Sequence, residues 1–369
     1  MDIGLSGCES ETSTVRARLE PMMDGRRRWR YRSVREDAPR VKPPPVPDPP
    51  AVLVTGGAGY VAGPLLSRLI DRGLRVIVLD NLIQGHTDTL PPEVELWTAS
   101  AGDQGVLEEI LGRGDVSAVF HFAGDSSVEA SVKDPVTTYR HNVAEGLRLI
   151  ETVARDHAHV PFILSSTAAV YGAASSAAIP EDAPVTPQSP YGETKRVLEA
   201  ALRWVGEARG LRWAALRYFN AAGAEGPLRE RHQPETHLIP NLLNAARSGS
   251  AVTVFGTDYP TADGTAVRDY VHISDLADGH LLALDHLGRA GPSGAFNLGS
   301  GRGHSVQEVV HAVSEVTGRV LRVTPGPRRP GDPPALVADI RRARALLGYE
   351  PRHSDITTII ETAWQAMSL

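Results

Sequence analysis

The sequence predicts an α/β protein: a doubly wound parallel Rossmann sheet with a smaller α/β substrate-binding lobe. From residue 51 onward, short apolar runs rich in β-branched residues alternate with helical patterns, which is typical of parallel βαβ units. A glycine-rich turn follows the first of these runs. The chain has 369 residues, of which 41% are hydrophobic, so it can form one large domain and a smaller one.

The expected elements follow one another as strand and helix. Strands are expected over residues 51–55, 75–80, 116–123, 161–165 and 211–216, and helices over residues 60–71, 105–111, 135–157 and 191–209. Beyond Phe219 the pattern loosens. Helices are expected there over residues 238–248, 274–286, 305–317 and 356–367, with short strands over 252–255 and 296–298. This second region is expected to form the lobe, interleaved with returns to the main sheet.

Composition excludes several classes of function. The net charge of −6 gives no sign of general nucleic-acid affinity. Cys8 is the sole cysteine, so no intramolecular disulfide can form, as expected of a cytoplasmic protein. No run of about 18 apolar residues occurs, which argues against a membrane span. No metal ion is expected.

Residues 1–50 differ from the rest of the chain. They carry ten Lys/Arg and eight Asp/Glu, and seven of the twelve residues 39–50 are proline. This composition predicts a disordered tail rich in arginine and proline that ends in a stiff polyproline spacer.

The glycine-rich turn has the features of a dinucleotide site. Gly56 permits a tight turn, Gly59 lets backbone N–H groups approach a pyrophosphate, and Ala62 allows close packing of helix on sheet. Asp80 ends the second strand, where a carboxylate accepts hydrogen bonds from the adenosine ribose and repels a 2′-phosphate. The turn therefore predicts NAD, in preference to NADP.

A tyrosine and a lysine lie four residues apart at the start of an expected helix. This spacing places Tyr191 and Lys195 on one helix face. The lysine charge is expected to lower the pKa of the tyrosine, which can then accept a proton from an alcohol that is being oxidised. Thr167 ends a strand at the carboxyl edge of the sheet, so its hydroxyl can share the substrate alcohol with Tyr191.

Several motifs in order resemble the extended short-chain dehydrogenase/reductase family and, within it, the UDP-glucose 4-epimerases. The similarity runs from about Val52 to Met367. The motifs are Thr-Gly-Gly-Ala-Gly-Tyr-Val at 55–61, Leu-Asp-Asn-Leu at 79–82, His-Phe-Ala-Gly at 121–124, Ser-Ser-Thr-Ala-Ala-Val-Tyr-Gly at 165–172, Ser-Pro-Tyr-Gly-Glu-Thr-Lys at 189–195, Leu-Arg-Tyr-Phe-Asn at 216–220, Pro-Glu-Thr-His-Leu-Ile-Pro at 234–240, Phe-Gly-Thr-Asp-Tyr-Pro-Thr at 255–261, Val-Arg-Asp-Tyr-Val-His at 267–272 and Arg-Arg-Pro-Gly-Asp at 328–332.

The resemblance implies an isomerase that epimerises UDP-hexoses at C4 by transient oxidation, rotation of the 4-keto sugar and return of hydride. It implies that residues 51–218 form the NAD-binding domain, that residues 219–369 bind the UDP-sugar, and that the protein is a homodimer. By position, NAD would be held by Gly56, Gly59, Tyr60, Val61, Asp80, Asn81, Phe122, Ala123, Asn142, Tyr191, Lys195 and Tyr218. The UDP-sugar would be held by Thr167, Asn220, His237, Leu238, Thr253, Phe255, Arg268, Arg329, Asp332 and Leu336.

The sequence departs from the family pattern at three places near the expected cofactor. The dinucleotide turn ends in Gly63-Pro64, where the family tends to have Ser-His. The family usually has Gly-Asp after the third strand for an adenine contact, but here the aligned residues are Ala99-Ser100-Ala101 and Gly102-Asp103 is displaced. The family often has a lysine after His-Phe-Ala-Gly, but here Asp125 follows. That lost positive charge is expected to loosen the nicotinamide end of the site.

Three alternatives stay open to different degrees. A 4,6-dehydratase needs an acid/base pair just after Thr167, and Ala168 and Ala169 argue against one. An epimerase for UDP-N-acetylhexosamines or UDP-pentoses is the nearest rival, and Leu336 bears on it because the family residue there borders the 2-position of the sugar. A catalytically silent NAD-binding regulatory protein is disfavoured by the intact Thr167, Tyr191 and Lys195.

Overall fold

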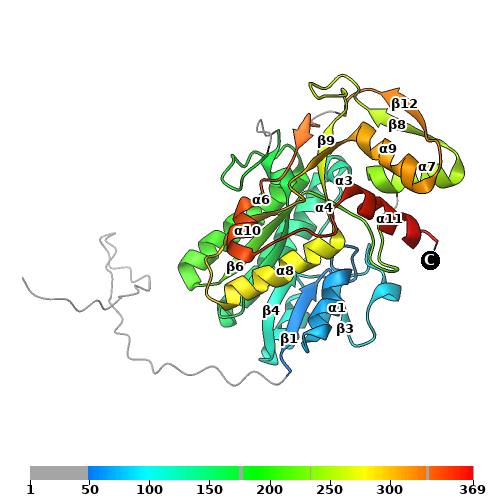
Figure 1. Cartoon of the computed structure of the whole chain (residues 1–369). Helices are drawn as coiled ribbons and strands as arrows, with labels where there is room; N and C mark the ends of the chain where they lie inside the picture. Colours follow the sequence, from blue (N-terminus) through cyan, green and yellow to red (C-terminus); the bar gives the residue numbers. More distant parts are fainter. Residues whose placement is uncertain (1–48, 174–177, 233, 330–331, 369) are drawn as a thin grey trace, which may run out of the picture. The chain divides into compact units, whose positions relative to one another are not determined.

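A parallel sheet of seven strands forms the centre of the fold (Figure 1). The strand order is β10-β6-β5-β4-β1-β2-β3, which confirms the predicted doubly wound Rossmann architecture. The order reverses between β1 and β4, so the carboxyl ends of these strands diverge into a crevice. The strands are β1 (Ala51–Thr55), β2 (Arg75–Asp80), β3 (Glu95–Thr98), β4 (Val116–His121), β5 (Phe162–Thr167), β6 (Trp213–Tyr218) and β10 (Gly294–Leu298).

The structure is a computed structural model that describes residues 49–173, 178–232, 234–329 and 332–368. The tail predicted over residues 1–50 therefore lies outside the described residues, apart from Pro49 and Pro50. In the part of the chain that is described, no helix combines the length and the apolar character needed to cross a bilayer.

Helices cover both faces of the sheet because its strands alternate their side chains between two cores. Val52 and Val54 pack on one face with α1 (Gly63–Asp71), α8 (Ile273–Gly288) and α10 (Arg341–Leu347). Leu53 packs on the other face with α2 (Gln104–Gly112), α5 (Glu145–Asp156) and α6 (Pro190–Arg209). All five residues of β1 are buried, as expected for a central strand covered on both sides.

The single helix expected over residues 135–157 is interrupted by a π-turn. It consists of α4 (Pro135–Tyr139), the π-helical segment Arg140–Ala144 and α5. The wider turn places Asn142 inside the protein, where its side chain is almost completely buried. The short helix α3 (Val128–Lys133) and the edge strand β3 were not expected from the sequence.

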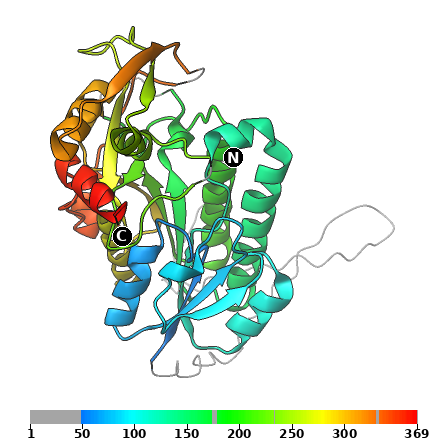
Figure 2. The ribbon, with the colours of Figure 1, turned by 90° about the vertical axis from the view of Figure 1, so that its right-hand side faces the viewer.

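The second region contains two smaller sheets and its own core. In one sheet, β9 (Val267–His272) pairs with β7 (Asn220–Ala222), β11 (Gly303–Ser305) and β13 (Ala335–Leu336). In the other, β8 (Ala251–Phe255) pairs in parallel with β12 (Arg322–Gly326). Helices α7 (Leu238–Ser248), α9 (Val306–Thr317) and α11 (Ile356–Ala366) surround the core, and this region occupies the upper left of the view in Figure 2. Strand β10 then returns the chain to the main sheet beside β6.

A buried ion pair connects the helix α6 to the main sheet. Arg217 of β6 donates to Glu199 of α6 through Nε at 3.0 Å and Nη2 at 2.6 Å. Ser166 of β5 donates to the same carboxylate, and Arg217 Nη1 donates to Tyr171 Oη at 2.8 Å. Both charged side chains are less than a tenth exposed. The bidentate geometry and the additional hydrogen bonds offset the cost of removing two charges from water.

We predict that Glu199→Ala lowers the free energy of unfolding by about 3–5 kcal/mol, because it leaves Arg217 charged, buried and without its carboxylate. Guanidinium titration followed by circular dichroism measures the change. The matched control is Glu207→Ala on the same helix, whose exposed carboxylate lies 4.0 Å from Arg203; it should change stability by about 0.5 kcal/mol or less. Similar small effects in both variants would contradict the prediction.

Candidate active site

The glycine-rich turn lies between β1 and α1, at the crevice where the strand order reverses. Gly56 adopts a φ of +73°, and a Cβ built there would lie 2.4 Å from the backbone nitrogen of Ala123. This position therefore requires glycine for two reasons, the positive φ and the close approach of the β4 end. Helix α1 begins at Gly63, later than the predicted residue 60, because the turn occupies residues 56–62. Pro64 in its first turn is compatible with a helix start.

Asp80 fixes this turn from the end of β2. Its Oδ2 accepts from the backbone N–H of Ala58 at 3.0 Å, and its Oδ1 accepts from the N–H of Leu82 at 2.9 Å. Its side chain is mostly buried, whereas Asn81 beside it is exposed. Asp80 thus places a negative charge where the sequence analysis expected the adenosine ribose.

The predicted Thr/Tyr/Lys set comes together at the carboxyl edge of the sheet. Thr167 is the last residue of β5, and its Oγ1 accepts from the N–H of Ala169 at 3.1 Å. Tyr191 lies in the first turn of α6, which Ser189 caps by accepting from the N–H of Gly192. Lys195 follows one turn later and is 3% exposed.

Burial dominates the proton affinities of this set. Burial raises the pKa of the Tyr191 phenol, and a hydrogen bond with Thr167 partly opposes the rise. Burial lowers the pKa of Lys195 to about 8, and the negative charges of Asp125 and Glu199 oppose that change. The sequence analysis expected the Lys195 charge to lower the pKa of Tyr191, but burial of the phenol raises that pKa in the structure.

Asn142 holds the helix α6 in place. Its Nδ2 donates to the carbonyl of Asp125 at 2.9 Å and to Thr194 Oγ1 at 3.0 Å, and its Oδ1 accepts from the N–H of Asp125. The side chain thereby joins the π-turn to α6 beside Lys195 and to the segment that follows β4. These contacts explain why the helix widens at Asn142.

A buried histidine that the sequence analysis missed connects two of the predicted cofactor residues. His280 of α8 stacks on Phe122 with ring centroids 4.6 Å apart and hydrogen-bonds the hydroxyl of Tyr218. Its Nδ1 donates to the carbonyl of Leu276 at 2.7 Å. Both ring nitrogens are thus satisfied in a neutral imidazole, and burial lowers the pKa of His280 to about 4. Tyr191 lies close enough to raise the pKa of Tyr218 by its charge.

The remaining predicted cofactor residues surround the turn. Tyr60 donates to the carbonyl of Gly223 at 2.6 Å, which joins the turn to the segment after β7. Gly59, Val61 and Ala123 are partly buried beside it. Asp103, displaced from the family position, caps α2 by accepting from the N–H of Val106.

The residues predicted for the UDP-sugar come together in pairs within the second region. Arg268 of β9 forms an ion pair with Asp332, and the Arg329 guanidinium lies 4.6 Å from the ring centroid of Phe255. Leu336 of β13 lies opposite Arg268 in the register. The others are Asn220 at the start of β7, Thr253 on β8, His237 as the N-cap of α7 and Leu238 as its first residue.

Asp269 is a second residue that the motifs did not single out. It is completely buried in β9 and accepts from the N–H groups of Ser300, Gly301 and Ala338. It thereby joins three segments beneath the predicted UDP-sugar residues. Burial raises the pKa of Asp269 to about 6 despite these bonds.

Fold and site together are those of a dinucleotide-binding Rossmann protein with a Tyr/Lys pair. A model of the NAD dependent epimerase/dehydratase family matches residues 52–299, and the chain belongs to this family. A UDP-glucose 4-epimerase of Lactobacillus helveticus is 44% identical over 318 residues, which are 85% of this chain and 96% of that protein. A UDP-glucose 4-epimerase of Corynebacterium glutamicum is 43% identical over 314 residues, 85% of this chain and 94% of that protein.

Solved structures give the same result. The crystal structure of UDP-glucose 4-epimerase from Brucella ovis in complex with NAD aligns with a TM-score of 0.82 at 42% identity, covering 86% of this chain and 98% of that chain. The enzyme from Bifidobacterium longum in complex with NAD⁺ and UDP aligns with a TM-score of 0.79 at 33% identity, with coverage of 86% and 98%. The resemblance inferred from the motifs is therefore confirmed.

We predict that His280 makes stability depend on pH below about 6.5. Because its folded pKa of about 4 lies below the unfolded value of 6.5, the unfolded chain binds the proton more readily, and stability falls as the pH decreases from 6.5 toward 4. His280 alone lowers the free energy of unfolding by about 1.4 kcal/mol for each pH unit in this range. Urea unfolding at pH 7 and pH 5 should show a smaller difference in His280→Leu than in the parent protein. An unchanged difference would contradict the assignment.

Proposed function

We propose that this protein is an NAD-dependent isomerase that interconverts UDP-glucose and UDP-galactose by epimerisation at C4. The observation that carries the proposal is the placement of Thr167, Tyr191 and Lys195 at the carboxyl edge of the sheet, the edge at which the turn at Gly56 also lies. The UDP-glucose 4-epimerases to which the chain is 41–44% identical over 85% of its length support the choice of substrate.

The described residues fit NAD. The turn at Gly56 leaves no room for a side chain, so backbone N–H groups can approach a pyrophosphate. Asp80 supplies the carboxylate for the adenosine ribose and repels a 2′-phosphate. The set that would hold the cofactor is Gly56, Gly59, Tyr60, Val61, Asp80, Asn81, Phe122, Ala123, Asn142, Tyr191, Lys195 and Tyr218. NAD would supply a hydride acceptor, and later donor, for the carbon that bears the 4-hydroxyl.

Tyr191 is the proposed general base and acid. Its phenolate accepts the proton of the 4-hydroxyl, with the Thr167 hydroxyl between them, and the resulting phenol returns the proton after the keto sugar has turned. Because burial raises the pKa of the phenol, positive charge is needed to ionise it, and Lys195 provides such a charge one helical turn away. Asn142 and Glu199 keep α6 in position while the proton moves.

The second region, residues 219–369, is proposed to hold the UDP group. Arg268 and Arg329 are planar donors suited to a diphosphate, and Asp332 can accept from ribose hydroxyls. In the structure Arg268 forms an ion pair with Asp332. A diphosphate bound to Arg268 would take the place of this carboxylate as the anion beside the guanidinium. Asn220, His237, Leu238, Thr253, Phe255 and Leu336 complete the proposed set.

The function is tested by incubating the purified full chain with UDP-galactose, with and without added NAD. UDP-glucose should form without added cofactor, because the cofactor is regenerated in each cycle and stays bound. Denaturing the protein should release NAD and little NADP. Absence of interconversion even with added NAD would exclude the proposal and favour a silent NAD-binding protein.

Tyr191→Phe is predicted to lower kcat by a factor on the order of 10² or more, because the proton acceptor is lost. Binding of UDP, measured by calorimetry, should barely change, since the phenol hydroxyl is not proposed to contact it. Tyr139→Phe, on the partly exposed end of α4, serves as a control and should leave kcat unchanged. Turnover near the parent value in Tyr191→Phe would refute the role of the phenol.

Leu336 is proposed to limit the range of sugars. It is partly buried and packs against the cluster around Phe219 and Tyr171, so space near the sugar 2-position is apolar. An acetamido group buried there without partners for its N–H and C=O costs about 1–3 kcal/mol.

We therefore predict that UDP-N-acetylglucosamine is turned over with a kcat/KM about tenfold below that for UDP-glucose, a factor of ten corresponding to about 1.4 kcal/mol. Leu336→Tyr should lower the acetamido activity further and keep the hexose activity. If kcat/KM is higher for UDP-N-acetylglucosamine than for UDP-glucose, the proposed main substrate is wrong. If UDP-N-acetylglucosamine is not turned over at all, the proposed role of Leu336 is wrong.

We also propose that the protein is a cytoplasmic homodimer. Helices α3, α4, α5 and α6 lie side by side (Figure 2). They expose apolar side chains, namely Val128, Val132, Val136, Leu147 and Trp204, each at least 39% accessible. Such a group on neighbouring helices is typical of an interface with another chain. The cytoplasmic location rests on the single cysteine, which leaves no intramolecular disulfide to form.

The double variant Val132→Glu, Val136→Glu is predicted to be monomeric in sedimentation equilibrium, because it places charges inside the proposed interface. Val320→Glu, at a position 95% exposed in the second region, should leave the parent dimer intact. A monomeric parent protein would contradict the proposal.

A further inference from the structure

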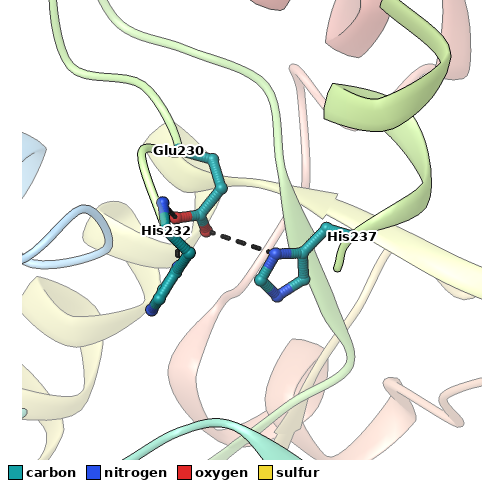
Figure 3. Close-up of side chains that lie close together, drawn as sticks. All are labelled: Glu230, His232 and His237. Carbon is teal, nitrogen blue, oxygen red and sulfur yellow. Dashed lines mark hydrogen bonds and ion pairs between the residues drawn. The ribbon is translucent and has the colours of Figure 1, made fainter. Parts of the chain in front are cut away.

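Three potential metal ligands converge in the segment before α7. Glu230, His232 and His237 each offer one ligand atom, and these atoms all lie within 4.8 Å of one another (Figure 3). The Glu230 side chain is 11% exposed, that of His232 28% and that of His237 49%. The cluster is thus anchored in the protein on the Glu230 side and accessible from solvent on the His237 side.

The two carboxylate oxygens of Glu230 have different surroundings. Oε1 accepts from the backbone N–H groups of Arg231 at 3.0 Å and His232 at 3.3 Å, and from the ring of His232. Oε2 faces Nδ1 of His237 at 4.0 Å, which is too far for a hydrogen bond. Two ligand atoms of one tetrahedral Zn²⁺ lie about 3.3 Å apart, given metal–ligand bonds of about 2.0–2.2 Å. A shift of less than about 1 Å would therefore bring both atoms to one ion.

The segment is held in place by contacts outside the cluster. Arg231 forms a bidentate ion pair with Asp88, with both distances 2.9 Å. Glu235 accepts from Nδ1 and from the backbone N–H of His237, both at 2.8 Å. Glu235 therefore orients the His237 ring and adds a second negative charge beside the cluster. A nitrogen that binds a metal ion carries no hydrogen, so an ion bound by His237 Nδ1 would replace the hydrogen bond of that atom to Glu235.

We infer that Glu230, His232 and His237 form a binding site for one divalent transition-metal ion, with Zn²⁺ as the ion that best suits two imidazoles and a carboxylate. Such a set leaves a fourth position open, as in zinc sites of the His₂Glu type. Imidazole ligands favour Zn²⁺ or Ni²⁺ over Mg²⁺ and Ca²⁺, which prefer oxygen alone. The sequence analysis expected no metal, and the three residues form none of the common spaced metal motifs. The ion would join the segment at residues 230–232 to the N-cap of α7.

The test measures Zn²⁺ uptake by the full chain after chelator treatment and dialysis, without UDP-sugar. A chromophoric chelator competes for the ion. One equivalent per chain should bind tightly, and His232→Ala and Glu230→Gln should each weaken it by a factor of about 10–100. Millimolar Mg²⁺ should not displace it. Because no turnover is measured, the result does not depend on the proposed epimerase activity.

Matched controls separate this cluster from other histidines and from the tail thiol. His311 and Glu315 form an exposed pair at 3.6 Å on α9, so His311→Ala and Glu315→Gln should keep the tight equivalent. Cys8→Ser should keep it as well. Zinc-edge X-ray absorption of the parent protein should show two imidazoles and oxygen ligands, which decides the question even if a cluster variant fails to fold. No tight equivalent in the parent, equal affinity in the cluster variants, or a sulfur ligand would overturn the inference.

Discussion

The buried pair between Glu199 and Arg217 is the contact on which the geometry of the site depends. It joins the helix that carries Tyr191 and Lys195 to the strand that ends at Tyr218, and through Ser166 to the strand that ends at Thr167. A charge pair in this position is costly to desolvate, and a hydrophobic replacement of equal volume is often as stable. Its directional bonds, unlike an apolar contact, restrict α6 to one position along and around its axis.

The same network extends toward the second region. Arg217 also donates to Tyr171, whose hydroxyl donates to Asn297 on β10 at 2.7 Å, and Asn297 donates to the carbonyl of Ile179. On the opposite side of α6, Asn142 fixes Thr194. Helix α6 is therefore held by polar contacts on two sides, while its apolar residues Leu198 and Leu202 fill the core below. Position and stability thus come from different residues of one helix.

Sequence patterns predicted most of the central sheet because its strands are continuous apolar runs. Strand β3 was missed because it is a short edge strand in which the partly buried Glu95 and Trp97 alternate with the exposed Leu96 and Thr98. Strand β9 was missed because Arg268, Asp269 and His272 give it the composition of a loop, although backbone N–H groups satisfy Asp269 inside the protein. The π-turn was not predicted because the segment Arg140–Ala144 contains neither glycine nor proline to mark an irregular helix.

For the candidate site, local spacing placed Thr167, Tyr191 and Lys195 correctly at one edge of the sheet. The sequence also held an unused signal: Arg217 is a charge within an otherwise apolar strand, and Glu199 lies one turn beyond Lys195. The pairings of Arg268 with Asp332 and of Arg329 with Phe255 were beyond reach, because the partners are more than sixty residues apart. The pKa of Tyr191 depends on burial, which no local pattern reveals.

The return of β10 to the main sheet has a consequence for synthesis on the ribosome. All six residues of β6 are buried in the finished protein, and β10 covers one of its edges. That edge stays open until about 75 further residues have been made, which takes roughly 4–15 s at bacterial or eukaryotic elongation rates. During this interval the nascent chain presents an apolar strand with free N–H and C=O groups, a template for pairing with other chains. The residues that build the second region thus delay the closure of the first, and a nascent chain stalled before Gly294 would be prone to aggregate.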